Sequence, residues 1–477
     1  MIAKREWDYI FNPQSVAIVG ISAKQTTFFS AGQRYLAALL EYGFKGKIYP
    51  INPRGGEILG LKVYANIRDI PELVDYVISC VPALATPQLI KDCAAKGVKV
   101  VHFFTSGFSE TGTEEGKQLE SEICSLAYQG GIRVIGPNCM GVYCPKTNFT
   151  YRPTFAEESG SVAFICQSGG NATYLVREGA KRGVRFSKVV SYGNACDIDE
   201  SDLIEYLADD RDTEIILAYI EGVKDGRRFS RVLKEGARAK PVIVLKGGVG
   251  EAGARAVASH TGALVGADEV WDALLCQAGA IRVYSLEELV DMAVTFSYLP
   301  LPRGRRVGII GSGGGATVLA VDDCTKAGLA VPRFSMETQD KLKSYLGKGG
   351  TGVGLSNPVD LSDQGWDIFR HCTKIILDYD GIDLLIAHLH VGVFGANQIS
   401  ALLSIAKQVV KSHEESNKPM AMIVGSPISA ESWHAALGCE QECRENNLPV
   451  YHSLSNAAKA IVRFLDYHEH RSVKGQS

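Results

Sequence analysis

The segment SVAFICQSGGNATYLVREGAKRG (residues 161–183) passes from a short apolar run, through the turn Gln167-Ser168-Gly169-Gly170, into a longer amphipathic run. An apolar run followed by a glycine turn and an amphipathic run is typical of the strand, turn and helix of a βαβ unit. The same alternation continues from end to end of the chain. It predicts an α/β protein built on parallel sheets.

The apolar runs fall into blocks. The five runs of the first block begin at Ser15, Lys47, Tyr76, Lys99 and Arg133. They predict a Rossmann-like domain over residues 1–145. The four runs of the second block begin at Ser161, Lys188, Glu214 and Pro241, and a helical stretch follows from Leu286. They predict a flavodoxin-like domain over residues 146–298.

A change of composition separates the second block from a third. The stretch LPLPRG (residues 299–304) cannot continue a helix, because proline lacks the N–H donor and glycine loses more entropy on ordering, so we interpret it as a linker. The third block restarts with RRVGIIGSGGG at Arg305 and has further apolar runs from Ile382, Pro419 and Leu448. It predicts a second flavodoxin-like parallel-sheet domain over residues 303–470.

Charge and composition exclude several classes of protein. The chain has 477 residues, and its 50 Lys and Arg against 53 Asp and Glu give no field that would attract nucleic acid or an anionic membrane. It lacks a signal-peptide core and any apolar run of about 18 residues, which predicts a soluble, cytoplasmic protein. The 12 cysteines are scattered as expected of reduced core thiols. The pairs Cys139/Cys144 and Cys439/Cys443 lack further ligands, so no metal site is expected.

The ends of the first two apolar runs carry a candidate phosphate site. Gly20 ends the first run, where glycine lets backbone N–H groups approach a phosphate, although it can equally serve a tight turn. The second run ends Asn52-Pro53-Arg54 instead of the Asp or Glu that an NAD site requires. A cation there suits an additional phosphate, either that of NADP or the 3′-phosphate of coenzyme A. Arg54 can also be a solvated loop charge.

Two later loops are candidates to line one crevice. The third run ends Cys80-Val81-Pro82, and the fifth ends Gly136-Pro137-Asn138-Cys139. Ligands of open α/β sheets bind beyond the carboxyl ends of the strands, where both loops are expected. Turns shaped by proline explain the same residues without a ligand, so both interpretations stay open.

The turn Ser168-Gly169-Gly170 predicts an anion cradle. At a helix N-terminus these residues present unobstructed N–H groups and the positive end of the helix dipole. Ser168 as a nucleophile is less favoured, because Cys166 replaces the first glycine of the G-x-S-x-G pattern. A simple helix cap is a further interpretation.

His260 lies in LKGGVGEAGARAVASHTGAL (residues 245–264), among small residues that can pack little around it. The composition predicts a mobile or exposed loop, on which a lone histidine is ordinarily only a surface residue. An imidazole can accept a phosphoryl group when a carboxylate holds its other ring nitrogen. Glu221, at the end of the apolar run EIILAYIE, is a candidate for that carboxylate, or else an exposed acid at a strand end.

Several segments together carry a family resemblance. They are SVAIVGIS, YPINPRGGEILG, RVIGPNCMGV, FICQSGGNATYL, VSYGNACDIDESDLIEYL, YIEGV and, most specifically, VASHTGAL. The chain resembles the α subunit of ADP-forming acyl-CoA synthetases, the family that includes acetate-CoA ligase and is related to succinyl-CoA synthetase. The resemblance makes the first block a Rossmann-like CoA-binding domain and implies a role for Gly20, Ser22, Asn52, Arg54, Val81, Pro82 and Asn138.

The resemblance also implies the chemistry. His260 is expected to become a phosphohistidine, with Glu221 as its carboxylate partner and Ser168, Gly169 and Gly170 as its phosphate cradle. The expected reaction interconverts acyl-CoA, ADP and phosphate with a carboxylic acid, CoA and ATP. No segment looks like an ATP-grasp domain, so ADP, ATP and Mg²⁺ are expected on a β subunit, in an α2β2 assembly.

Other functions remain possible at the level of sequence. They are a CoA-dependent acyl or carbamoyl transferase without a nucleotide-binding partner, a non-catalytic CoA-binding module and an NADP oxidoreductase, which the histidine segment disfavours. The third block resembles a further ligase domain of the family, in which Gly311 to Gly315 form either a second anion cradle or a close-packed turn. The sequence does not identify the acid.

Overall fold

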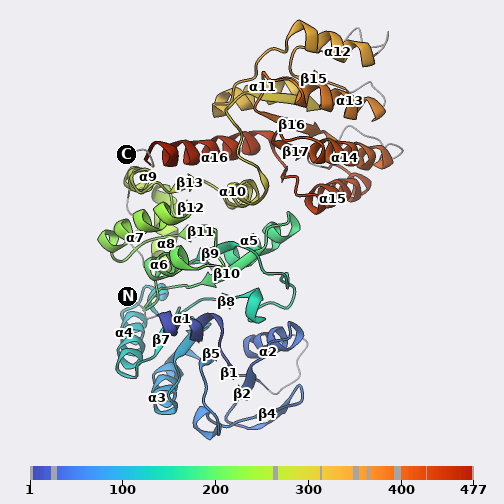
Figure 1. The fold of residues 1–477 in the computed structure, drawn as a ribbon. Coiled ribbons are helices and arrows are strands. Elements are labelled where there is room, and N and C mark those ends of the chain that lie inside the picture. Colours follow the sequence, from blue (N-terminus) through green and yellow to red (C-terminus); the bar gives the residue numbers. More distant parts are fainter. Residues whose placement is uncertain are drawn as a thin grey trace. The chain divides into compact units, whose positions relative to one another are not determined.

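The computed structural model describes residues 4–22, 30–261, 267–311, 314–346, 354–361, 366–391, 399–425 and 427–474. The chain forms two compact units, Met1–Leu289 and Val290–Ser477. The first unit contains one parallel sheet, one large sheet that is parallel except for an edge strand, and a small two-stranded sheet, and the second unit contains one parallel sheet (Figure 1). The predicted α/β fold class is confirmed.

The first sheet is parallel throughout and contains the five predicted strands. They are β1 (Ser15–Val19), β2 (Lys47–Ile51), β5 (Tyr76–Ser79), β6 (Val100–Phe103) and β7 (Arg133–Ile135), in the order β2-β1-β5-β6-β7. The direction of winding reverses between β1 and β5, and ligands of such sheets bind at the carboxyl ends beside the reversal. The helices of this region are α1 (Lys4–Phe11), α2 (Ala31–Glu41), α3 (Thr86–Lys96) and α4 (Glu114–Gln129).

The second sheet has the flavodoxin-like order, with one additional edge strand. Its parallel strands are β9 (Val162–Cys166), β10 (Phe186–Ser191), β11 (Ile215–Ile220), β12 (Val242–Lys246) and β13 (Ile281–Val283). The order is β13-β12-β11-β9-β10-β8, and β8 (Gly141–Tyr143) pairs antiparallel with β10. β8 thus lies in the range predicted for the first domain but belongs to the second sheet. The helices are α5 (Gly169–Lys181), α6 (Glu200–Asp209), α7 (Gly226–Ala239), α8 (Gly250–Thr261) and α9 (Asp268–Ala278).

The sheet of the second unit repeats the same strand order. Its strands are β14 (Val307–Gly311), β15 (Val359–Asp360), β16 (Leu384–Leu389), β17 (Met420–Val424) and β18 (Val450–Tyr451), in the order β15-β14-β16-β17-β18. Its helices are α11 (Gly314–Ala327), α12 (Met336–Leu346), α13 (Trp366–Leu377), α14 (Ile399–Glu414), α15 (Ala430–Glu445) and α16 (Leu454–Lys474). The apolar runs of the third block therefore form a flavodoxin-like sheet.

The second unit begins inside a helix, before the stretch LPLPRG. Helix α10 (Leu286–Tyr298) crosses the division between the two units. Its Phe296 ring packs on Phe464 and Tyr467 of α16, with centroid distances of 4.9 and 5.3 Å. The carboxyl half of α10 is thus part of the second unit's core.

Within the first unit, the loop that follows β10 runs along β7 and joins the two sheets. The amides of Asn194 and Cys196 donate to the carbonyls of Pro137 and Gly136 at 3.0 and 2.9 Å. A Cβ at Gly193, whose φ is +53°, would lie 2.1 Å from the Pro137 oxygen. Only glycine fits this crossing.

Two side-chain contacts tie the same loop to the first sheet and its loops. The guanidinium of Arg133 donates to both carboxylate oxygens of Asp197, at 2.9 and 2.8 Å. The side-chain amide of Asn194 donates to the carboxylates of Glu110 at 2.6 Å and Glu120 at 2.8 Å. The bidentate pair and the shared amide fix the orientation of the loop as well as its position.

We predict that Gly20→Ala destabilises the first unit by about 2–5 kcal/mol. The φ of Gly20 is +92°, and a Cβ there would lie 2.7 Å from the Cys80 carbonyl oxygen. Left-handed strain contributes about 1–2 kcal/mol, and overpacking about 1–3 kcal/mol. The control is Gly97→Ala, because Gly97 has a φ of +80° with no atom within 4 Å of its added Cβ. Scanning calorimetry would measure both variants, and equal losses would contradict the prediction.

Candidate functional site

A pocket of about 690 Å³ lies where the carboxyl ends of four parallel strands meet in the first unit. Its walls come from the loops after β5, β6, β7 and β9, with Ala31 at the start of α2. The lining residues are Ala31, Cys80, Val81, Pro82, Phe104, Thr105, Ser106, Asn138, Cys139, Met140, Gln167, Ser168, Gly169 and Gly170. The structure thus brings together two groups of residues predicted from the sequence, the coenzyme loops at Val81, Pro82 and Asn138 and the cradle at Ser168–Gly170.

Thr105, which the sequence did not single out, joins the two coenzyme loops. Its hydroxyl donates to the carbonyl of Val81 at 2.7 Å, and its carbonyl accepts from the amide of Asn138 at 2.9 Å. Thr105 is buried and directly follows the apolar run of β6. A threonine after a strand carries no local signal of this kind, because its partners are distant in sequence.

The other residues predicted for coenzyme binding lie outside the pocket lining. Gly20 passes close to Cys80 at the end of β1. The side chain of Asn52 donates to the carbonyl of Ile21 at 2.6 Å and so fastens the loop after β1 to the end of β2. The Ser22 carbonyl accepts from Gln33 at 2.7 Å, in the capping region of α2. These residues shape the β1 side of the crevice.

Arg54 is exposed, next to Asn52. Its backbone amide donates to the Asn52 side chain at 2.9 Å, which fixes the turn. Within the described ranges its guanidinium makes neither a hydrogen bond nor an ion pair. The cation is therefore available to an anion in solution.

Ser168 begins the helix α5 as its N-cap. Its hydroxyl accepts from the Asn171 amide at 3.3 Å, which confirms the interpretation as a helix cap, while the anion cradle stays a prediction. The first amides of a helix have no partner inside it, and Gly169 and Gly170 supply two of them. A Cβ at Gly169 would lie 2.4 Å from Cγ of Met140, whereas at Gly170 its nearest neighbour would be the Ser168 hydroxyl at 3.9 Å. The helix start is thus packed on one side and open on the other.

Glu221 is buried, and the structure corrects the alternative of an exposed strand-end acid. It follows β11, and its Oε2 has no hydrogen-bond partner among the described residues. Gln167, predicted as part of the turn but not as a site residue, accepts with its side-chain oxygen from the amides of both Glu221 and Gly222, the latter at 3.1 Å. The Tyr219 hydroxyl bonds to Glu221, and burial followed by this carboxylate's charge raises the pKa of Tyr219. A buried carboxylate with one free oxygen is suited to accept a further donor.

His260 lies in the helix α8, so the prediction of a loop at this position is wrong. Alanine at positions 252, 254, 256 and 258 gives the segment high helix propensity, which the glycines before it do not cancel. The His260 side chain and residues 262–266 lie outside the described part of the chain. Helix α8 packs against η3 (Ser109–Thr111), in the loop that leads on from β6 and the pocket wall.

Comparisons with known proteins agree with this arrangement. Two family models match, the CoA binding domain over residues 14–145 and the succinyl-CoA ligase like flavodoxin domain over residues 159–296. The α subunit of ADP-forming acetate–CoA ligase II from Pyrococcus furiosus is 36% identical, and the match covers 96% of this chain and 97% of that protein. The chain belongs to the α subunits of ADP-forming acyl-CoA ligases.

Two further relatives extend the match to a single-chain enzyme and to a solved structure. The ADP-forming acetate–CoA ligase of Methanocaldococcus jannaschii is 36% identical over 97% of this chain and 63% of its own length. The dinucleotide-forming acetyl-coenzyme A synthetase 1 of Ca. Korarchaeum cryptofilum, solved with phosphate and ADP, has a TM-score of 0.82 and 30% identity over 98% of this chain and 99% of that one.

This ligase subunit is therefore an acid–thiol ligase with a CoA-binding domain. The predicted family and function are confirmed, and the relatives do not favour a transferase or a non-catalytic module. No helix in the described ranges has the length and hydropathy needed to cross a membrane.

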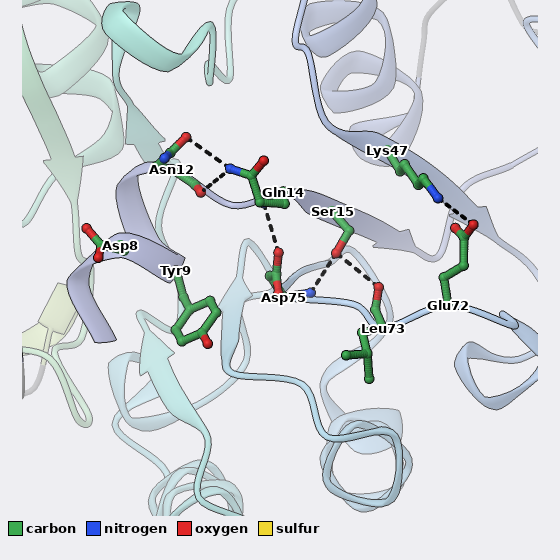
Figure 2. A pocket seen from close by; sticks show the side chains of 9 residues that line it. All are labelled: Asp8, Tyr9, Asn12, Gln14, Ser15, Lys47, Glu72, Leu73 and Asp75. Carbon is green, nitrogen blue, oxygen red and sulfur yellow. Dashed lines mark hydrogen bonds and ion pairs between the residues drawn. The ribbon is translucent and has the colours of Figure 1, made fainter. Parts of the chain in front are cut away.

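A second cavity of the ligase subunit, about 560 Å³, lies at the opposite, amino edge of the first sheet. Figure 2 shows its polar groups bonded to one another: Lys47 pairs with Glu72, and the Ser15 hydroxyl bonds to Leu73 and Asp75. Ligands of parallel sheets bind at the carboxyl edge, so this cavity is a poor candidate.

The glycine segment predicted as a second cradle lies only partly within the structure. Gly311 ends β14 and Gly314 begins α11, while Ser312 and Gly313 lie outside the described residues. Residues 392–398, in the loop after His390, also lie outside them. A second cradle therefore stays a prediction.

Lys246 is a buried cation beside Glu221 that the sequence analysis missed. Its ammonium donates to the carbonyls of Glu221, at 2.8 Å, and Gly247, and lies 5.3 Å from the ring centre of Trp271. It thereby holds together the ends of β11 and β12, from which Glu221 and the segment leading to α8 emerge. Burial lowers the pKa of Lys246 to about 8, and the charge of Glu221 acts in the opposite direction.

We predict that Lys246 makes stability rise with pH. An unfolded lysine titrates near 10.5, so between about pH 8 and that value the unfolded chain holds a proton that the folded chain has lost. The unfolding free energy of wild type, minus that of Lys246→Met, should therefore increase from pH 8 to about pH 10. Urea titrations at each pH would measure it, with Lys181→Met at the exposed end of α5 as the control. A difference that stays flat over this window would contradict the assigned pKa.

Proposed function

We propose that this subunit transfers a phosphoryl group between an acyl phosphate and a nucleotide, with His260 as the intermediate carrier. The observation that supports this proposal is the pocket, because loops of the CoA-binding sheet and the N-terminus of α5 line the same cavity. A thioester on one side and a phosphate on the other would meet there. The amide of Glu221 donates to Gln167 of the pocket wall, and the helix of His260 packs on η3 in the loop after β6.

The proposed reaction has three reversible steps. A phosphate oxygen bonds to the acyl carbon while the C–S bond breaks, and the electron pair leaves with the sulfur of CoA. A ring nitrogen of His260 then attacks phosphorus, and the acid leaves as its carboxylate. Finally, an oxygen of ADP takes the phosphoryl group and His260 is regenerated. Helix N-terminal amides would neutralise the charge on the transferring group.

Coenzyme A would lie across the reversal point between β1 and β5. We assign its binding to Gly20, Ser22, Asn52, Arg54, Val81, Pro82 and Asn138. Gly20 lets the chain pass close to β5, and Asn52 fixes the turn that carries the exposed Arg54. The guanidinium suits the 3′-phosphate, and the loops at Val81 and Asn138 would guide the thiol end into the pocket.

Ser168, Gly169 and Gly170 would bind the phosphate, and Glu221 would hold the His260 ring. The unpartnered Oε2 of Glu221 supports this role, because an acceptor is available for the N–H of an imidazole. A ring nitrogen that donates to a carboxylate leaves the other nitrogen free to attack.

The nucleotide site would lie on the partner. We propose a β subunit with an ATP-grasp domain that holds ADP or ATP with Mg²⁺, in an α2β2 assembly. The M. jannaschii relative supports this, since this chain matches 63% of its length and leaves room for a further domain in one polypeptide. Acetate is the first acid to test, because of the names of the relatives. The 12 free cysteines suit a reducing compartment such as the cytoplasm.

The proposal predicts that His260→Ala abolishes ATP formation from acyl-CoA, ADP and phosphate by the complex with its partner subunit. Labelled phosphate and acyl-CoA should leave acid-labile, base-stable label on wild type and none on the variant. His434→Ala is the control, since His434 is an exposed histidine in another helix. Label that persists in His260→Ala would reject the assignment.

Glu221→Gln should lower turnover about 10²-fold, because the neutral amide stabilises the charged imidazole less. The control is Glu214→Gln, the same change at the exposed opposite end of β11. Rapid-quench labelling with radioactive phosphate would show whether the rate of phosphohistidine formation falls by the same factor as turnover. Equal turnover in the two variants would exclude Glu221 from the site.

A further inference from the structure

Met140 stands between the coenzyme loops and the phosphate cradle. It follows Asn138 and Cys139 in the chain, and its side chain packs on Gly169, where an added Cβ would overlap its Cγ. Its backbone is fixed on both sides, since the amide donates to the Ser191 hydroxyl at 3.1 Å and the carbonyl accepts from Tyr35 at 2.9 Å. The main chain is therefore held independently of the methionine side chain.

The part of the pocket around Met140 is uncharged. None of the lining residues within the described ranges is Asp, Glu, Lys, Arg or His. Burial raises the pKa of the Cys80 thiol to about 12 and that of Cys139 as well, so both stay protonated at neutral pH. Phe104, which meets the Tyr35 ring edge-on, adds an apolar surface. Such a lining suits an acyl group without a second charge.

The reacting acyl carbon must lie between the sulfur of CoA and the attacking phosphate. In the proposed complex the loops at Val81 and Asn138 hold the CoA sulfur, and Ser168 to Gly170 hold the phosphate. We propose that the Met140 side chain fills the space beside this carbon and so limits the size of the acyl group that the ligase accepts. The inference rests on the proposed function and adds the residue that determines specificity. The methionine side chain takes up space that a branched or aryl acyl group would need, while a small acyl group fits beside it.

The test uses the complex with the partner subunit and measures kcat/KM for acetyl-CoA, isobutyryl-CoA and phenylacetyl-CoA with phosphate and ADP. Met140→Ala should raise the ratio of isobutyryl-CoA to acetyl-CoA at least 10-fold, because each methylene in an apolar pocket changes discrimination about 10–200-fold. Met140→Val should shift the ratio in the same direction by less. Met140→Leu conserves the volume and should leave the ratio within about 3-fold of wild type. Met336→Ala, at an exposed methionine of α12, is the matched control.

Separate readouts distinguish the inference from the proposed function. Labelling of His260 from ATP does not involve the acyl group, so it should be equal in wild type and Met140→Ala. Wild type without that label would overturn the proposed function. Normal labelling with unchanged thioester ratios in both Met140→Ala and Met140→Val, or an equal loss for every thioester, would overturn the inference alone. Should Met140→Ala fail to fold, Met140→Val and Met140→Leu decide the result.

Discussion

The arrangement of the first unit depends on the contact between two loops, the loop after β10 and the loop after β7. The loop after β10 lies along the end of β7, with backbone hydrogen bonds from Asn194 and Cys196 and no space for a side chain at Gly193. Both loops follow the carboxyl ends of parallel strands, where α/β sheets bind their ligands. Their contact therefore brings the ligand edges of two sheets together. The pocket that joins the loops after β5, β6 and β7 to the start of α5 depends on it.

The described residues that line the pocket carry no formal charge, whereas the charged residues Glu221 and Lys246 are buried close by. Thr105 and Gln167 bind backbone atoms of neighbouring loops and so fix their positions. Glu221 and Lys246 are both buried, and Lys246 binds the carbonyl of Glu221 rather than its carboxylate. One carboxylate oxygen is thereby left unsatisfied within the described structure. A buried group of this kind reduces stability, and such groups are typical of sites that act on a ligand.

The parallel strands of the three large sheets share one order, but the surroundings of the sheets differ. In the second unit the strand order reverses between β14 and β16. There His388 is buried, and burial, with the nearby His390, lowers its pKa to about 4, so the ring is neutral. The first two sheets contribute loops to a common pocket because their carboxyl edges meet within the first unit.

The sequence by itself determined most strands of the three large sheets, the helix start at Ser168 and the family, because apolar periodicity, a glycine turn and the segment VASHTGAL are local patterns. The short strands β8, β13 and β15 were not predicted. The sequence did not determine that the segment around His260 is helical, because the alanines there compete with glycines over a few residues. The roles of Thr105, Gln167 and Lys246 were decided only by tertiary structure. The partners that define these roles, Val81 for Thr105, Gly222 for Gln167 and Glu221 for Lys246, lie 24 to 55 residues away in the chain. Strand order alone brings such residues together, so no local pattern could show that they build the site.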